Sequence, residues 1–139
     1  MAGALGLAFA SRPAHAQVAN LNDAINKAGR QRMLSQRMAK FYLAAMLPVD
    51  ASTATTEIAK ARSEFIAATE LLRNAPQATN RIRQELQLAD GQWVFFDAAL
   101  QRMQGGGNVN RQVAEVYVAS ENLLSSMDRV TGMYAALAA

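Results

Sequence analysis

The chain has 139 residues, of which 51% are hydrophobic, and it contains no cysteine and a single histidine. This length suits one domain, and the lack of cysteine excludes a disulfide, a thiolate nucleophile and a sulfur-ligated metal within the chain. Fourteen Lys and Arg residues against eleven Asp and Glu residues give a net charge of +3, a mild basic excess that does not indicate a nucleic-acid-binding domain.

The first sixteen residues have the pattern of a secretory signal peptide. A short apolar run, Ala4–Ala10, precedes Ala14-His15-Ala16, a small-x-small sequence of the kind that signal peptidases cleave. The run is much shorter than the ~20 apolar residues that a transmembrane helix needs. We therefore expect residues 1–16 to be removed and residues 17–139 to form a periplasmic domain without histidine. The alternative is an unstructured cytosolic N-terminus.

Residues 17–139 divide into four predicted helices. Apolar residues recur at steps of three and four over about 18–47, 51–74, 77–104 and 109–137. The breaks between these segments are Pro48, Pro76 and the run Gly105-Gly106-Gly107-Asn108. Short connections between long helices favour antiparallel neighbours, so we predict an all-α, antiparallel up-down four-helix bundle.

The predicted core is apolar in the second, third and fourth helices. We expect the aromatic cluster Trp93, Phe95 and Phe96 to lie in this core, together with Met33, Met38, Met46, Met103 and Met127. The first helix differs, because stepping from Leu21 along one face places a charged residue and a hydroxyl in an otherwise small and apolar seam. This seam consists of Leu21, Ile25, Ala28, Arg32, Ser35, Ala39, Tyr42 and Met46.

The first helix has a second apolar stripe on another face. It is formed by Leu34, Met38, Phe41 and Ala45. We therefore expect two buried faces on this helix, one inside its own bundle and one against a partner.

Positive charge is concentrated on the same helix. Between residues 18 and 47, five basic residues stand against Asp23 alone, a net charge of +4. A buried arginine needs a carboxylate, backbone carbonyls or a bound anion, and its planar fork suits a carboxylate or nitrate. The alternative for Arg32 is an internal ion pair with Asp90, Asp97 or Asp128, or a side chain that reaches solvent.

Two families share motifs with this sequence. The run Ile25–Ala39 (INKAGRQRMLSQRMA) resembles the N-terminal sensor domain of type IV pili methyl-accepting chemotaxis transducers, the PilJ family. Residues 92–96 and 120–128 also resemble later helices of that family. A more distant resemblance links Ala28-Gly29-x-x-Arg32-Met33-x-Ser35-x-Arg37 to the periplasmic domain of nitrate/nitrite sensor kinases.

The second resemblance implies a ligand site. In those kinases the matching motif binds an anion between the paired first helices of a dimer. The resemblance implies that Arg32 binds the anion and that Gly29, Met33, Ser35 and Arg37 occupy neighbouring positions of the motif. Arg30-Gln31 replaces a small, apolar pair of that box and Gln36 replaces an aromatic residue. The anion therefore stays open between a nitrate- or nitrite-like ion and a carboxylate.

We thus expect a periplasmic, sensor-like module that binds a small anion at Arg32 in a homodimer. We expect it to act through a membrane sensor or envelope partner, because no cytoplasmic signalling segment follows residue 139. The alternative is a structural or interaction module that docks on an envelope or chemosensory complex without a ligand. We expect no enzyme activity, metal, cofactor or nucleic acid, since the sequence has neither a Glu-x-x-His pair nor a phosphate-binding loop.

Overall fold

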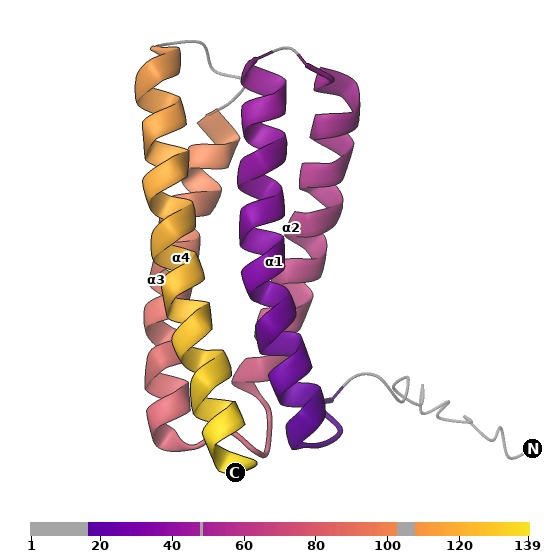
Figure 1. Ribbon diagram of the computed structural model, residues 1–139, viewed down its shortest axis with the longest axis vertical. Coiled ribbons are helices and arrows are strands. Elements are labelled where there is room, and N and C mark those ends of the chain that lie inside the picture. Colours follow the sequence, from indigo (N-terminus) through magenta and orange to yellow (C-terminus); the bar gives the residue numbers. More distant parts are fainter. Residues whose placement is uncertain (1–16, 48, 103–107) are drawn as a thin grey trace, which may run out of the picture.

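The computed structural model describes residues 17–47, 49–102 and 108–139, and all regular secondary structure within them is helical. Four helices follow in chain order: α1 (Leu21–Met46), α2 (Ala51–Arg73), α3 (Asn80–Gln101) and α4 (Val109–Leu137) (Figure 1). The prediction of an all-α four-helix bundle is confirmed. The predicted signal peptide, Met103 and the triple glycine lie outside the described residues.

Each helix begins at a polar residue whose side chain accepts a hydrogen bond from a backbone N–H three residues further on. These four capping residues are Asn20, Asp50, Thr79 and Asn108. Such a bond satisfies one of the N–H groups that the first helical turn leaves without a partner. The caps explain why α1 begins at Leu21 rather than Val18, and why α3 begins at Asn80 rather than Gln77.

Neighbouring helices run in opposite directions, as the ion pairs between them show. Along each pair of helices, the residue numbers of the partners rise on one helix while they fall on the other. The pairs are Arg30–Glu64 and Arg37–Glu57 between α1 and α2, Arg62–Asp97 and Arg73–Asp90 between α2 and α3, and Glu85–Arg129 and Arg102–Glu115 between α3 and α4.

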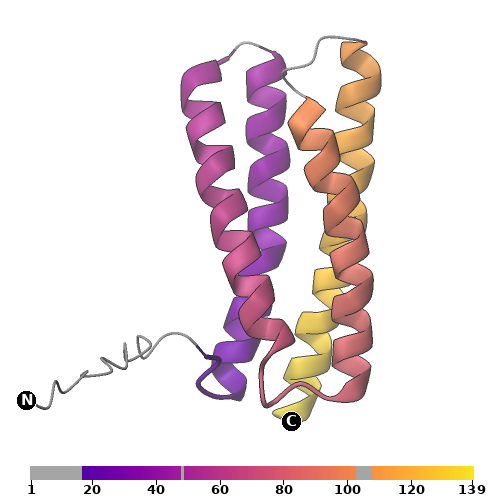
Figure 2. The same ribbon diagram turned by 180° about the vertical axis from the view of Figure 1, so that it is seen from behind.

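The four helices do not approach one another equally. Helix α1 packs closely on α2 and α4, and α3 packs closely on α4, whereas α2 and α3 come near each other at few points. Figure 2 shows α2 and α3 on separate sides of the molecule along most of their length. In packing order the helices are therefore α2, α1, α4 and α3, and the pair α1/α4 joins the two halves.

Side chains bridge the wider space between α2 and α3. The rings of Phe65 and Trp93 stack with centroids 4.5 Å apart, and Trp93 meets Phe96 edge-on. The Arg62 guanidinium donates to both carboxylate oxygens of Asp97, Nε to Oδ1 at 2.7 Å and Nη2 to Oδ2 at 2.9 Å. This contact is bidentate, the strongest form of a surface ion pair.

The core contains the apolar seams predicted for α2, α3 and α4, with one aromatic residue misplaced. Phe65, Phe96 and Leu123 are buried, but Phe95 is 72% exposed, so its assignment to the core was wrong. The reason is helical geometry, because Phe95 lies about 100° around α3 from Phe96, which carries the seam. No helix in the described part of the chain is long and apolar enough to cross a membrane.

Asp97 makes stability depend on pH. The hydrogen bond from Arg62 holds the pKa of the Asp97 carboxyl below its ordinary value, so the pair stabilises the fold at neutral pH and is lost as pH falls through the folded-state pKa. We predict that Asp97→Asn lowers the free energy of unfolding at pH 7 and that its difference from wild type shrinks at about pH 3. Urea unfolding at both pH values measures this. The same comparison for Glu121→Gln, an exposed carboxyl outside this pair, should change little with pH; a constant deficit for Asp97→Asn would contradict the prediction.

Candidate functional site

The core-facing seam of α1 runs through Gln31, next to the small and apolar seam that the sequence indicated through Arg32. Stepping by four and three from Ala24, rather than from Leu21, passes through the fully buried positions. These are Ala24, Ala28, Gln31, Ser35, Met38 and Tyr42. Arg32 is one position further round the helix, and its side chain is 41% exposed.

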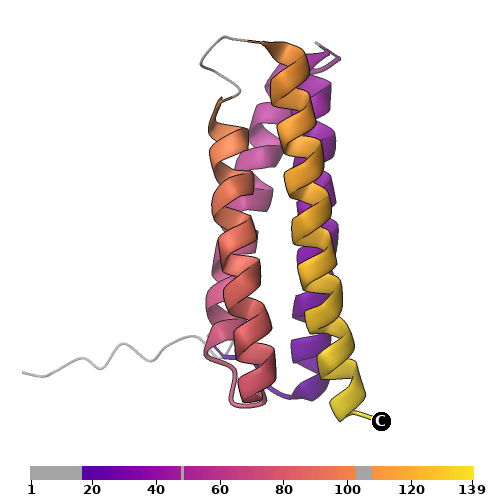
Figure 3. The ribbon, with the colours of Figure 1, turned by 90° about the vertical axis from the view of Figure 1, so that its left-hand side faces the viewer.

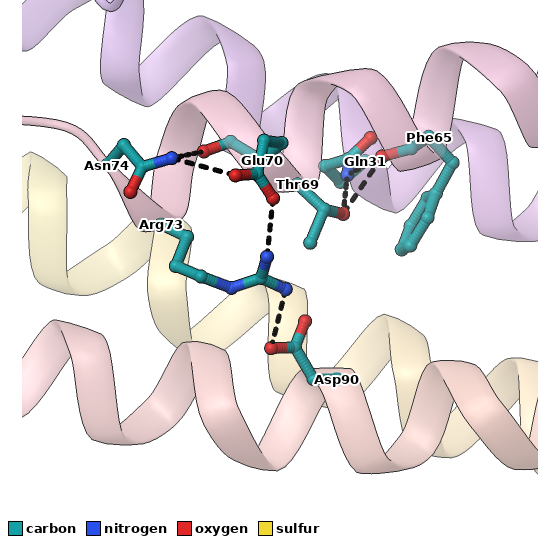
Figure 4. A network of polar contacts seen from close by, with 7 residues as sticks. All are labelled: Gln31, Phe65, Thr69, Glu70, Arg73, Asn74 and Asp90. Atoms are coloured by element: carbon teal, nitrogen blue, oxygen red, sulfur yellow. Dashed lines mark hydrogen bonds and ion pairs between the residues drawn. The ribbon is translucent and has the colours of Figure 1, made fainter.

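Gln31 is the polar residue that sequence reasoning missed in this seam. Its Nε2 donates to the Phe65 carbonyl at 2.9 Å and to Thr69 Oγ1 at 2.8 Å, which ties α1 to α2 (Figure 4). Its Oε1 is buried and finds no hydrogen-bond partner within the described part of the chain. An amide in this position satisfies the core better than a guanidinium, because it carries no charge to desolvate.

Arg32 reaches across to α4. Its Nη1 donates to Asp128 Oδ1 at 2.7 Å, and the Asp128 side chain is 64% exposed. Of the carboxylates that the sequence offered as internal partners, the structure thus selects Asp128. The guanidinium also folds back along α1, because Nη2 lies 3.5 Å from the point where a Cβ on Gly29 would be. A Cβ at position 29 would thus make an ordinary van der Waals contact with this end of the side chain.

A shallow groove of about 500 Å³ surrounds this ion pair between α1 and α4. Three of the five predicted site residues, Gly29, Arg32 and Met33, line it from α1. The other lining residues are Gln36 from the same helix and Leu124, Ser125 and Asp128 from α4. Met33 was expected in the core, but its side chain is 40% exposed on the outer face of α1.

The two remaining predicted residues lie elsewhere. Ser35 is buried beneath the groove, where its hydroxyl donates to the Arg32 carbonyl at 2.7 Å. Gln36 Nε2 donates to Ser35 Oγ and to the Ser120 carbonyl, both at 3.3 Å, and so joins α1 to α4 below Arg32. Arg37 points to the other side, because five residues along an α-helix correspond to about 140° of rotation.

Arg37 and Arg30 belong to the α2 side of α1. Arg37 Nη2 donates to Glu57 Oε2 at 2.8 Å, and Arg30 pairs with Glu64. The hydrogen bond from Arg37 lowers the pKa of Glu57, and the hydrogen bond from Arg30 lowers the pKa of Glu64, so both carboxylates are ionised at neutral pH. Together with Arg32, these arginines surround Met33 on the outer half of α1, and each is paired with a carboxylate of a neighbouring helix.

This arrangement offers electrostatic recognition. Within the described residues, no three acidic or histidine side chains come close enough together to hold a metal ion. The Arg32 guanidinium lies beside Gly29, and Asp128, its only ion-pair partner in the described part of the chain, has a side chain that is 64% exposed. The guanidinium can therefore exchange this carboxylate for another planar oxyanion.

Comparison with protein families identifies a match over most of the chain. The family model PilJ, described as type IV pili methyl-accepting chemotaxis transducer N-term, matches residues 14–122. This range contains all five predicted site residues and extends into α4. No curated protein and no solved structure gives a match.

Gln31 provides a test of how the core tolerates its polar residue. Gln31→Leu removes the buried Oε1 without a partner, while the Phe65 carbonyl keeps the hydrogen bond from Thr69 Oγ1 at 2.8 Å. We predict that the free energy of unfolding of the variant lies within about 1 kcal/mol of wild type, because removal of the unpartnered Oε1 and added apolar burial offset the two hydrogen bonds lost from Nε2. Phe65→Ala, measured beside it by urea unfolding, should lose about 3–5 kcal/mol. A loss above about 2 kcal/mol for Gln31→Leu would show that the amide contributes more than a neutral hydrogen bond.

Proposed function

Because this chain belongs to the PilJ family, the N-terminal domains of type IV pili methyl-accepting chemotaxis transducers, we propose that it is a periplasmic sensor module that binds a small anion at Arg32. Family membership makes it a sensory or signalling domain, and the anion, the dimer and the compartment belong to the proposal. Recognition is electrostatic and leads to a shift in helix packing rather than to covalent chemistry.

The observation that carries the proposal is the Arg32–Asp128 pair in its groove. A guanidinium presents five N–H donors, and the contact with Asp128 uses Nη1. Ion pairs that are this exposed contribute only about 0–1 kcal/mol, so a ligand oxyanion has little to displace. Nitrate, nitrite and carboxylates all present two oxygens in one plane, which the fork can hold together.

The outer face of α1 supports a homodimer. Met33, a large apolar residue, is 40% exposed on this face, four residues from Gly29 and so one turn of the helix away. In a symmetric pair, each Arg32 would meet the Arg32 of the other copy near the axis, and an anion between them would offset their repulsion. Binding and association are therefore coupled in this proposal.

Export of residues 17–139 is a further part of the proposal, with residues 1–16 as the signal peptide. Its support is the apolar run Ala4–Ala10 followed by Ala14-His15-Ala16. The exported domain would pass its signal to a membrane sensor or an envelope complex. We predict that protein recovered from a periplasmic extract begins at Gln17. Intact-mass measurement checks this, and a full-length mass in the cytosolic fraction alone would contradict it.

One observation favours a second candidate, an interaction module that binds no ligand and docks on an envelope or chemosensory complex. Arg32 already has a carboxylate partner in its own chain, so the charge is compensated without an anion. In this case the Arg32–Asp128 pair only fastens α1 to α4.

Titration with anions separates the two candidates. We predict that wild type binds at least one of nitrate, nitrite and acetate in calorimetry, and that Arg32→Gln weakens binding about ten- to hundredfold by removing a charge-assisted contact. Asp128→Asn should act in the opposite direction and strengthen binding by up to about fivefold, because it removes the competing carboxylate. Arg81→Gln on α3, an exposed arginine outside the groove, serves as the matched control and should bind like wild type.

Sedimentation equilibrium completes this experiment. The anion that binds should shift wild type toward a dimer and leave Arg32→Gln unchanged. If wild type binds none of the three anions, the anion proposal is wrong and the docking module remains. If the anion binds to a monomer without changing its mass, the placement of the site between two first helices is wrong.

A further inference from the structure

A second and larger groove lies on the other side of the molecule, between α3 and α4. Figure 3 looks directly onto these two helices. The groove has a volume of about 630 Å³, within the range of about 300–1,000 Å³ that is usual for small-molecule sites. Neither Arg32 nor any other residue predicted from the sequence as a ligand contact lines it.

The middle of this groove is apolar and open. Ala99, Ala114 and Ala119 are the small residues along it, and Phe95 and Val118 are the large ones. Phe95 is 72% exposed and Val118 is 54% exposed, so two large apolar side chains from different helices face solvent at the same groove. A concave, mostly apolar lining with a few polar groups is the usual composition of a small-molecule site.

One end of the groove is positively charged. Arg102 from α3 and Arg111 from α4 both approach the Glu115 carboxylate, Nη2 of Arg102 at 3.4 Å from Oε2 and Nε of Arg111 at 3.2 Å from Oε1. Two guanidinium groups thus share one carboxylate, which leaves a net charge of +1 among the three. The other end carries the amides of Gln92 and Asn122.

The charged end is backed by the protein interior. Tyr42 from α1 is fully buried, and burial, with a smaller contribution from Glu115, raises the pKa of its hydroxyl. Tyr42 therefore lies within electrostatic range of Glu115 and Arg102, while the Arg111 side chain at the outer edge of this end is 81% exposed.

We propose that the groove between α3 and α4 binds an amphipathic monocarboxylate, with its carboxylate at Arg102 and Arg111 and its apolar tail along Phe95 and Val118. The spare positive charge selects a single anionic group, and the apolar middle selects a hydrocarbon tail. Gln92 is ten residues from Arg102 along α3, about 15 Å at the rise of an α-helix, so the tail has a run of several carbons to cover.

This chemistry distinguishes the groove from the site at Arg32. The groove at Arg32 is the smaller of the two, and its apolar residues Met33 and Leu124 flank an ion pair at its middle rather than forming a run with the charge at one end. A small inorganic anion therefore suits the groove between α1 and α4, and a carboxylate with a hydrocarbon tail suits the groove between α3 and α4. The second site does not depend on the first.

The test uses the full chain and three probes: octanoate, its neutral analogue octanamide, and acetate, which has the same charged group without the tail. We expect octanoate to bind in calorimetry, octanamide to bind about tenfold more weakly because the charge is missing, and acetate to give no heat from this groove. The three probes are also titrated into Arg32→Gln, which removes the anion site of the proposed function, so that octanoate binding that remains in this variant comes from the groove between α3 and α4.

Four variants then locate the site. Arg111→Gln should lower octanoate affinity to the level of octanamide, and Glu115→Gln should raise it. Ala114→Trp places a large ring in the groove beside Arg111 and Glu115 without removing a core side chain, so it should abolish binding of both probes. Leu88→Ala, which shortens an apolar residue on α3 that is 60% exposed outside the groove, is the matched control and should bind like wild type.

Three results would overturn the proposal. The first is that wild type does not bind octanoate. The second is that octanoate binds but Arg111→Gln and Ala114→Trp, shown to be folded by circular dichroism, bind it equally well. The third is that wild type is a dimer which Ala114→Trp converts to a monomer while octanoate fails to bind; the groove would then be a contact between two copies of the chain.

Discussion

The cost of burying a guanidinium determines how α1 is rotated about its own axis. Helix α1 packs on both α2 and α4, so two of its faces must enter the core, yet Arg30, Arg32 and Arg37 recur along it. An uncompensated charge in the interior costs far more than an amide that keeps its hydrogen bonds. The helix therefore turns Gln31 inward, where Phe65 and Thr69 accept its hydrogen bonds, and leaves Arg32 at the boundary with α4.

That rotation places the arginines of α1 beside carboxylates of the neighbouring helices. Each arginine of α1 meets a carboxylate on a neighbouring helix: Arg30 meets Glu64, Arg37 meets Glu57 and Arg32 meets Asp128. Carboxylates on α2 and α4 thus compensate the positive charge of these arginines. Of these three pairs, the one with Asp128 lies in a groove between helices whose contact joins the two halves of the bundle. A ligand that replaces Asp128 acts on that contact directly.

The sequence specified the helices more reliably than the side chains that face the site. Capping side chains and apolar periodicity were enough for four helices, and the pattern in α2, α3 and α4 placed Phe65, Phe96 and Leu123 correctly in the core. In α1 the pattern was ambiguous, because Ala28, Ser35 and Tyr42 belong both to a stripe through Arg32 and to one through Gln31. Only the positions of Phe65 and Thr69 on α2, which depend on tertiary packing, decide between the two.

The same limit applies to the candidate site. Gly29, Arg32 and Met33 come together because they are near neighbours on one helix, which a sequence pattern can show. Arg37 shares the motif but not the groove, and Asp128 could be named only as one of three carboxylates, since partners 96 residues apart depend on helix pairing. The groove between α3 and α4 left no signal in the sequence beyond Phe95, which the pattern assigned to the core.

The open side of the bundle has a mechanical consequence. Helices α2 and α3 are held together by long side chains rather than by close backbone packing, whereas the contact between α1 and α4 joins the pair α1/α2 to the pair α3/α4. A small change in the crossing angle of α1 and α4 therefore gives a larger displacement of α2 relative to α3, in proportion to their distance from that contact. A ligand bound beside the contact between α1 and α4 is placed where a small movement produces a large displacement.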